Sequence, residues 1–172
     1  MPNVYLVGFM AAGKTAVGAA LARLLDRPFV DLDRAVEARL GLSVGEIFEL
    51  RGESAFRDAE TAELERIASR AGLVVAAGGG AFCSPFNREV MHGSGGVSVF
   101  LDPPWEVILG RMRASDPGRP KWIDEHHARE LYLARVPLYR TASFRIGVDG
   151  GEAPEEVGER IAAALAGAPC AI

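Results

Sequence analysis

Cysteine is nearly absent from this chain, whose 172 residues contain only Cys83 and Cys170, with no CxxC pair. A disulfide scaffold is therefore not expected, and reduced thiols in a cytoplasmic protein are the default. Histidine is also scarce, with three residues at positions 92, 126 and 127. No Cys/His cluster has the spacing of a metal site, so a metal held by such a cluster is not expected.

An excess of basic residues and long apolar runs are missing as well. The formal net charge is −4 and the pI is 5.4, whereas nucleic-acid and membrane-surface proteins usually carry a basic face. No apolar stretch approaches the roughly 20 residues that span a bilayer, and no basic segment followed by an apolar run suggests a signal peptide. We therefore expect a cytoplasmic protein with neither nucleic acid nor a membrane as partner.

Hydrophobic residues make up 49% of the sequence, enough for a substantial core in one domain of residues 1–172. Short apolar runs alternate with longer helical patterns, which favours a three-layer α/β/α fold around a parallel sheet. The expected strands are 3–8, 28–31, 73–77, 97–101 and 144–148, and the expected helices are 14–25, 33–40, 43–50, 54–71, 86–92, 104–114, 125–139 and 154–166. Open α/β sheets bind ligands at the carboxyl edge of the strands. Over this edge we expect a substrate-binding insertion, about 32–62, and a lid, about 114–124.

The most specific motif is Gly8-Phe9-Met10-Ala11-Ala12-Gly13-Lys14-Thr15, which matches the phosphate-binding pattern G-x-x-x-x-G-K-[ST]. An apolar run precedes it and apolar residues at helical spacing follow it, so the motif lies between a strand and a helix. Gly8 and Gly13 permit backbone turns that a side chain would block, and the turned N–H groups cradle phosphate oxygens. Lys14 supplies positive charge to the outer phosphates, and the Thr15 hydroxyl can ligate a phosphate-bound Mg²⁺. The nucleotide-binding residues expected here are Gly8, Ala11, Ala12, Gly13, Lys14, Thr15 and Ala16.

Two carboxylates, Asp31 and Asp33, close the second expected strand. Residues two apart on a strand share a face, so both face the phosphate loop if the extended conformation continues to Asp33. One can then help to hold hydrated Mg²⁺, and the other can accept a hydrogen bond from an attacking hydroxyl. The alternative is that Asp33 caps the helix that begins at Arg34.

Arginine and glycine supply the candidate acceptor site. The planar fork of Arg57 suits a carboxylate or a phosphate, although Arg57 could instead be an exposed helix residue paired with Glu53 or Glu60. The triplet Gly78-Gly79-Gly80 follows a buried strand, where glycine lets the backbone approach a ligand closely and offer its N–H groups. A flexible turn is the alternative for this triplet.

Two further arginines lie in or near the expected lid. Arg119, in Gly118-Arg119-Pro120, could neutralise charge on a transferring phosphoryl group when the lid closes, or could be a solvated loop residue. Arg135 lies near the end of the following helix. Two arginines that converge on one pocket, Arg57 and Arg135, would select an anionic acceptor.

In order and spacing these residues resemble the shikimate kinases, within the nucleoside-monophosphate-kinase-like group of phosphate-loop folds. The resemblance covers about residues 3 to 166, nearly the whole chain. It depends on the phosphate loop, Asp31-Leu32-Asp33, Glu46-Ile47-Phe48, Gly52-Glu53, Phe56-Arg57, Glu60, the glycine triplet, Gly118-Arg119-Pro120, Arg135 and Pro137-Leu138-Tyr139.

The resemblance implies a five-stranded parallel sheet in the order 2-3-1-4-5. It implies transfer of the ATP γ-phosphoryl group to the 3-hydroxyl of shikimate, with Mg²⁺, in aromatic amino-acid biosynthesis. Motif and resemblance together give these expected roles: Lys14, Asp33 and Arg119 catalytic; Thr15 and Asp31 toward Mg²⁺; Asp33, Arg57, Gly78, Gly79, Gly80 and Arg135 at shikimate; Arg119 facing the phosphates; Arg113 and Pro154 beside the adenine. A single small domain favours a monomer.

Two departures from the family pattern are visible. Ala11 stands where glycine is common, and we expect it to be tolerated if its φ is negative. The lid reads Arg119-Pro120-Lys121-Trp122, where a leucine pair usually follows Arg-Pro. These departures leave open another small carboxylated polyol, such as gluconate, as acceptor. The alternative from a different class is a nucleotide-binding regulatory protein with little kinase activity, although the guanine-reading motif Asn-Lys-x-Asp is absent.

Overall fold

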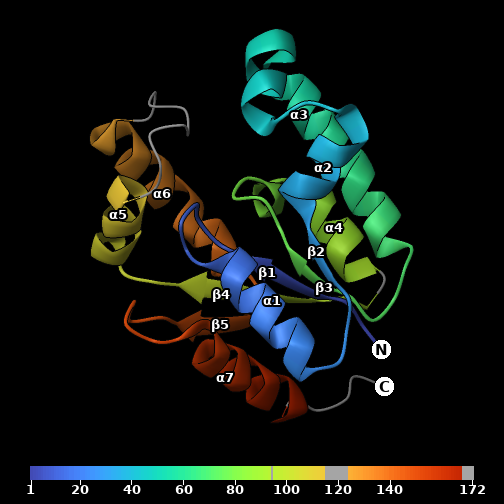
Figure 1. Cartoon of the computed structure of the whole chain (residues 1–172), viewed down its shortest axis with the longest axis vertical. Coiled ribbons are helices and arrows are strands. Elements are labelled where there is room, and N and C mark those ends of the chain that lie inside the picture. The colour runs from blue at the N-terminus through green and yellow to red at the C-terminus, as the bar shows by residue number, and fades with distance from the viewer. Residues whose placement is uncertain (94, 115–123, 168–172) are drawn as a thin grey trace.

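Five parallel strands form one sheet in the order β2-β3-β1-β4-β5 (Figure 1). The computed structural model describes residues 1–93, 95–114 and 124–167. The strands are β1 (Val4–Val7), β2 (Phe29–Asp31), β3 (Val74–Ala76), β4 (Val97–Asp102) and β5 (Phe144–Gly147). The predicted sheet and its strand order are confirmed. Because β1 lies between β3 and β4, the segment that follows β1 begins at the middle of the carboxyl edge.

The helices agree with prediction except around Gly52. They are α1 (Lys14–Leu24), α2 (Leu32–Leu40), α3 (Val44–Ala68), α4 (Pro85–Gly93), α5 (Trp105–Ala114), α6 (Glu125–Tyr139) and α7 (Pro154–Gly167), with a short 3-10 helix, η1 (Ala81–Cys83). Two helices were predicted where α3 is found. Gly52 has a φ of 80° and a ψ of 170°, so the predicted interruption exists as a kink inside α3. The sequence did not predict η1, which directly follows the glycine triplet.

Helices cover both faces of the sheet, and Figure 1 shows α1 and α7 beside each other on one of them. Side chains alternate along β1, so Val4 and Leu6 face the cluster that α1 and α7 complete with Leu21 and Ile161. The other side chains of β1 face the opposite way. A strand buried on both faces is typical of parallel sheets between two helical layers, and the predicted three-layer arrangement is confirmed.

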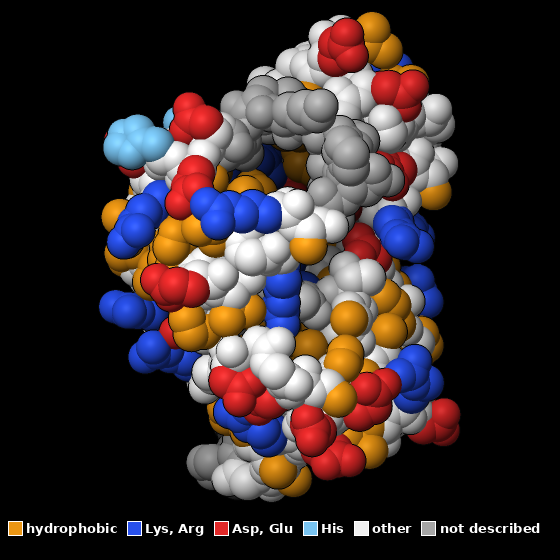
Figure 2. Space-filling model, turned by 60° about the vertical axis from the view of Figure 1, so that its left-hand side comes forward, with side chains coloured by type: hydrophobic (Ala, Val, Ile, Leu, Met, Phe, Trp, Pro, Cys, Tyr) orange, Lys and Arg blue, Asp and Glu red, His pale blue; other side chains and the backbone are white. Residues whose placement is uncertain are grey.

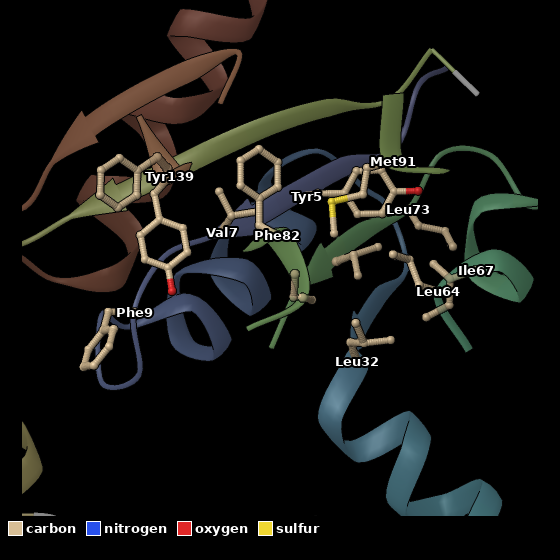
Figure 3. Close-up of a cluster of buried hydrophobic side chains, with 14 of the residues drawn as sticks. Tyr5, Val7, Phe9, Leu32, Leu64, Ile67, Leu73, Phe82, Met91 and Tyr139 are labelled. Atoms are coloured by element: carbon tan, nitrogen blue, oxygen red, sulfur yellow. The ribbon is translucent and has the colours of Figure 1, made fainter. Parts of the chain in front are cut away.

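The larger hydrophobic cluster lies on the second face and reaches the phosphate loop. In Figure 3, Leu64, Ile67 and Met91 gather near Tyr5 at one end, and Phe9 lies at the other end. The Phe9 ring meets the Tyr132 ring edge-on, with centroids 5.5 Å apart, and Phe9 is 1% exposed. The loop is therefore anchored to the core by the residue that follows its first glycine.

The segment 32–62 has a small hydrophobic cluster of its own. Val36 of α2 packs with Ile47 and Phe56 of α3, and all three are buried. The Phe48 ring completes the cluster, with its centroid 5.0 Å from that of Phe56. The interpretation of this segment as a substrate-binding insertion remains a prediction. Its small cluster shares no residue with the two clusters that flank the sheet, although Leu32 of the segment belongs to the larger of these.

The predicted lid, 114–124, lies outside the described residues except at its two ends. In the part of the chain that the structure describes, no helix combines the length and the apolar character needed to cross a membrane.

Candidate active site

The phosphate loop connects β1 to α1, and both of its fixed glycines have backbone angles that favour glycine. Gly8 has a φ of 142° and Gly13 a φ of 100°. A Cβ on Gly8 would lie 2.8 Å from the carbonyl oxygen of Leu101 on the neighbouring strand β4. Gly8 is therefore required for space as well as for its backbone conformation.

Ala11 also has a positive φ, of 60°. The condition under which alanine was expected to be tolerated here, a negative φ, is therefore not met. In this left-handed conformation the Cβ of an L-residue lies too close to a carbonyl oxygen, which costs roughly 1–2 kcal/mol. The loop thus contains a strained residue at the position where the family commonly has glycine.

Helix α1 starts inside the loop and its first turn is open to a ligand. Among the described residues no side chain caps this helix, and its first turn, which includes Ala16, holds no acidic residue. Free N–H groups and the positive end of the helix dipole make such a terminus a site for anions. The Lys14 ammonium donates to the carbonyl oxygens of Gly8, at 2.9 Å, and Phe9, at 2.8 Å. This places a positive charge within the loop.

Thr15 and Asp31 meet beside the loop. The Thr15 hydroxyl donates to Asp31 Oδ2 at 2.7 Å, and Asp31 also caps α2 by accepting from the backbone N–H of Arg34. One hydroxyl and one carboxylate next to a phosphate site suit Mg²⁺, which commonly binds one or two protein oxygens together with phosphates and water. The two residues predicted to hold the metal therefore lie together.

Asp33 does not continue the strand. The extended conformation ends at Asp31, and Asp33 lies in the first turn of α2. Both expectations for its backbone, an extended residue or a helix cap, are wrong, because Asp31 itself makes the cap. The side chain of Asp33 nevertheless reaches the glycine triplet, since a Cβ on Gly78 would lie 2.5 Å from its Oδ1.

The Asp33 carboxylate lies in a mostly buried position next to charged groups. Its Oδ1 is buried and has no hydrogen-bond partner in the described ranges. Burial raises the pKa of Asp33, while the nearby Lys14 ammonium acts to lower this pKa and the Asp31 carboxylate to raise it. A carboxylate with a raised pKa beside a cation is suited to accept a proton.

Glu60 of α3 shares this environment, and the sequence reasoning named it as a possible partner of Arg57 and as part of the family resemblance. It is 1% exposed, and its Oε1 would lie 2.5 Å from a Cβ on Gly78. Oε1 has no hydrogen-bond partner within the described part of the chain. Burial raises the pKa of Glu60, and Arg57 acts to lower it. The (i, i+3) spacing from Arg57 was the available signal for this residue.

Each glycine of the triplet faces a charged side chain. A Cβ on Gly80 would lie 2.5 Å from Arg57 Nη1, and one on Gly79 would lie 3.9 Å from Arg135 Nη1. The third glycine, Gly78, meets the two carboxylates described above. None of the three has a positive φ. Space therefore favours glycine at Gly78 and Gly80, where a Cβ would lie 2.5 Å from a charged side chain, whereas the contacts at Gly79 are ordinary. A merely flexible turn does not describe this triplet.

Arg57 and Arg135 line one cavity of about 450 Å³ beside the triplet. Arg57 donates to Glu60 Oε2 at 2.9 Å and to Glu53 Oε1 at 3.1 Å. Burial would lower the pKa of Arg57, but these glutamates raise it above its ordinary value, so the guanidinium stays charged. Arg57 is thus half-buried, pairs with two glutamates and also faces the cavity, and its role toward an anionic acceptor stays a prediction.

Tyr139 connects α6 to the glycine triplet. Its hydroxyl donates to the carbonyl oxygen of Gly79, and burial raises the pKa of this hydroxyl. Arg135 lies one turn earlier on the same helix, so the hydrogen bond fixes Arg135 relative to Gly79. In the sequence, Tyr139 contributed only to the family resemblance.

On the nucleotide side, Arg113 lies on the exposed side of α5 and pairs with Glu125 at 2.6 Å. Arg111, one of the residues that the sequence reasoning missed, donates instead to the carbonyl oxygens of Ala11 and Ala12 in the loop. Its (i, i+3) spacing from the buried residue Ile108 was the signal that it faces inward.

The other two residues predicted to contact the nucleotide are Pro154 and Arg119. Pro154 is the first residue of α7, which packs against α1. Arg119 lies outside the described residues. On the face in Figure 2, acidic and basic side chains are interspersed, and some basic ones lie in a hollow.

A phosphate loop at a helix start lies at the same edge of a parallel sheet as a cavity lined by two arginines and three carboxylates. This arrangement is typical of a P-loop kinase fold. The sequence model of the shikimate kinase family matches residues 10–166. The chain belongs to the shikimate kinase family.

Individual relatives agree. The chain is 44% identical to a shikimate kinase of Halorhodospira halophila, over 97% of this chain and 95% of the relative. It is 43% identical to one of Ruegeria pomeroyi, over 95% and 85% respectively. A solved structure of shikimate kinase from Acinetobacter baumannii in complex with shikimate superposes with a TM-score of 0.89 and 39% identity, covering 96% of this chain and 93% of that one. A gluconokinase from Sinorhizobium meliloti, with a TM-score of 0.60 and 22% identity, shares the fold alone.

Proposed function

We propose that the chain transfers the γ-phosphoryl group of ATP to the 3-hydroxyl of shikimate. The observation that carries this proposal is the position of Arg57 and Arg135 on one cavity, next to the triplet that Asp33 also reaches. Two guanidinium groups suit a carboxylate, and a buried carboxylate beside them suits an attacking hydroxyl. The relative from A. baumannii, which was solved with shikimate bound, supports the same acceptor.

On the acceptor side, Arg57 and Arg135 bind the carboxylate of shikimate. Gly79 and Gly80 leave room for the ring, and a side chain on Gly80 would collide with Arg57. Asp33 orients the hydroxyl and accepts its proton as the bond to phosphorus forms. This chemistry consists mostly of positioning, since phosphoryl transfer passes through a loose transition state.

On the phosphate side, the loop N–H groups and the start of α1 hold the phosphates, and Lys14 neutralises their charge. Thr15 and Asp31 hold Mg²⁺, which when bound neutralises charge on the phosphate oxygens. Arg119 of the proposed lid approaches the phosphates, and Arg113 and Pro154 flank the adenine. The exposed ion pair of Arg113 with Glu125 must open for that contact.

We also propose that the protein acts in the cytoplasm as a monomer, without nucleic acid or membrane. Its net charge of −4 supports this view, because polyanionic partners favour a basic surface. Sedimentation velocity at several protein concentrations measures the oligomeric state directly.

ADP release from ATP and Mg²⁺ tests the function, with shikimate, with gluconate and without acceptor. We expect strong stimulation by shikimate alone, and its loss in Lys14→Met. Stimulation by gluconate alone would mean that gluconate, and not shikimate, is the acceptor. Equally slow ADP release in all three assays would favour a nucleotide-binding regulatory protein.

A further inference from the structure

Arg111 reaches from α5 to the phosphate loop. Its Nη1 donates to the carbonyl oxygen of Ala11 at 3.2 Å and to that of Ala12 at 3.1 Å. The same nitrogen would lie 3.3 Å from a Cβ on Gly13. Arg111 is half-buried, and the residues that it joins are about a hundred positions apart in the chain. The contact therefore depends on the folded arrangement of α5 and the loop.

The carbonyl groups that Arg111 contacts belong to the strained part of the loop. Ala11 has a φ of 60°, which an L-residue with a Cβ adopts only at a cost. Two hydrogen bonds from a charged donor are stronger than bonds from a neutral one, and they offset that cost. Without them, an extended or right-handed conformation at Ala11 would be favoured.

The direction of these bonds matters for phosphate binding. In a planar trans peptide the C=O and N–H groups point in opposite directions. When Arg111 holds the carbonyl of Ala12, the N–H of Gly13 points away from α5. Lys14 holds the carbonyls of Gly8 and Phe9 in the first half of the loop. Two cations thus hold carbonyl groups in both halves of the loop.

We propose that Arg111 is a positioning residue that holds the phosphate loop in its phosphate-receiving shape through the carbonyls of Ala11 and Ala12. This inference rests on the proposed binding of nucleotide phosphates at the loop. It requires no contact between Arg111 and the nucleotide.

The test measures binding of inorganic tripolyphosphate, which has no base or sugar, and of ATP by calorimetry. In Arg111→Met we expect both affinities to fall about tenfold, because two hydrogen bonds to the loop are lost. The KM for shikimate should stay within about twofold. Arg23→Met is the matched control, since Arg23 lies on α1 and forms only a surface ion pair with Glu155. A fall in ATP affinity with unchanged tripolyphosphate affinity would overturn the proposal, since Arg111 would then act on the nucleoside.

Two more variants separate loop shape from charge. Arg111→Lys keeps the charge, but its ammonium ends one atom short of the Nη1 that donates both bonds, so we expect most of the loss to remain. Full affinity in Arg111→Lys would sink the proposal, because charge alone would then be sufficient. Combining Ala11→Gly with Arg111→Met should restore at least half of the lost affinity, on a logarithmic scale, because glycine needs no help to keep a positive φ.

Thermal melts show whether each variant is folded. If Arg111→Met does not fold, Arg111→Lys still tests the proposal. The two proposals fail in different ways. If the wild type bound neither ATP nor tripolyphosphate, the proposed function would be wrong. If it bound both, and the Arg111 variants bound them equally well, the inference about Arg111 would be wrong.

Discussion

The phosphate loop and the acceptor cavity both use cations, but the cations have different partners. In the loop, Lys14 and Arg111 donate to neutral backbone carbonyls. In the cavity, Arg57 donates to two carboxylates, Glu53 and Glu60. The carbonyl bonds leave the charge of Lys14 and Arg111 available to phosphate, with the Asp33 carboxylate near Lys14, whereas the charge of Arg57 is already compensated.

This difference predicts how each ligand competes. A phosphate that enters the loop approaches cations that donate to backbone carbonyls. A carboxylate that binds Arg57 must share it with Glu53 and Glu60, of which Glu60 is buried and Glu53 is exposed. The exposed pair contributes little and should yield first, whereas the buried pair should persist.

The largest expected effect concerns Asp33, the carboxylate that lies between the phosphate loop and the acceptor cavity. Asp33→Asn should lower kcat by about 10²- to 10⁴-fold, the range of general-base catalysis, with the affinity for ATP unchanged. Steady-state kinetics and calorimetry measure the two quantities. Asp102→Asn, a strand-end carboxylate paired with Arg145, is the control. An unaltered kcat in Asp33→Asn would remove Asp33 from the mechanism.

The next effect tests the guanidinium fork of the cavity. Arg57→Lys should raise the KM for shikimate about 10- to 100-fold, since a charged hydrogen bond is worth roughly 1.5–3 kcal/mol. Lysine is chosen because alanine would leave Glu60 buried without a partner charge. Arg51→Lys on the exposed surface of α3 is the control. If only the KM for ATP changed, Arg57 would not bind the acceptor.

The third prediction concerns the strained residue Ala11 of the phosphate loop. Ala11→Gly should raise the free energy of unfolding by about 1 kcal/mol, because glycine tolerates the positive φ. Ala12→Gly, next to it and without a positive φ, should lower the free energy of unfolding by about 0.5–1 kcal/mol. Urea denaturation compares the two. Equal signs for both variants would show that strain at Ala11 is not the cause.

A smaller effect should follow from releasing Arg57 from its exposed partner. Glu53→Gln should lower the KM for shikimate about two- to fivefold, because an exposed ion pair is worth up to about 1 kcal/mol. Glu49→Gln, also exposed on α3, should leave the KM unchanged. A higher KM in Glu53→Gln would mean that Glu53 holds Arg57 in place and does not compete for it.

The smallest effect depends on pH. Burial raises the pKa of Glu60 above its ordinary value of 4.5, so the folded state binds more protons than the unfolded state just above that pH. Stability therefore falls as the pH rises through that window. Glu60→Gln removes this loss, and the Tm difference from wild type should become more positive as the pH rises above 4.5.

Glu63 on the same helix provides a control of opposite sign. Hydrogen bonds from Arg66 lower the pKa of Glu63, so its contribution to stability is lost as the pH falls below 4.5. The Tm difference for Glu63→Gln should become more negative as the pH rises. If the Tm differences of Glu60→Gln and Glu63→Gln changed in the same direction with pH, the opposite pKa shifts of the two residues would be contradicted.

The sequence predicted the sheet well because its signals are local. Short apolar runs predicted the strands, the helical patterns 43–50 and 54–71 predicted a break inside α3, and one motif located the phosphate loop. What it could not supply depends on distant contacts or on backbone angles. The φ of Ala11, the turn that moves Asp33 from strand to helix, and the choice between Arg111 and Arg113 are each decided by how neighbouring elements pack. The roles of the site residues stay predictions until they are measured.

The small cluster of Val36, Ile47 and Phe56 has a consequence for how the protein opens. This cluster shares no residue with the sheet clusters, and only Leu32 at the start of α2 belongs to the larger of them. The rest of α2 and the part of α3 up to residue 57 can therefore unfold locally while exposing little of the central core. Amide hydrogens there should exchange with solvent earlier than those of β1. The segment carries Asp33 and Arg57, so the acceptor half of the site belongs to a less stable cooperative unit than the phosphate half.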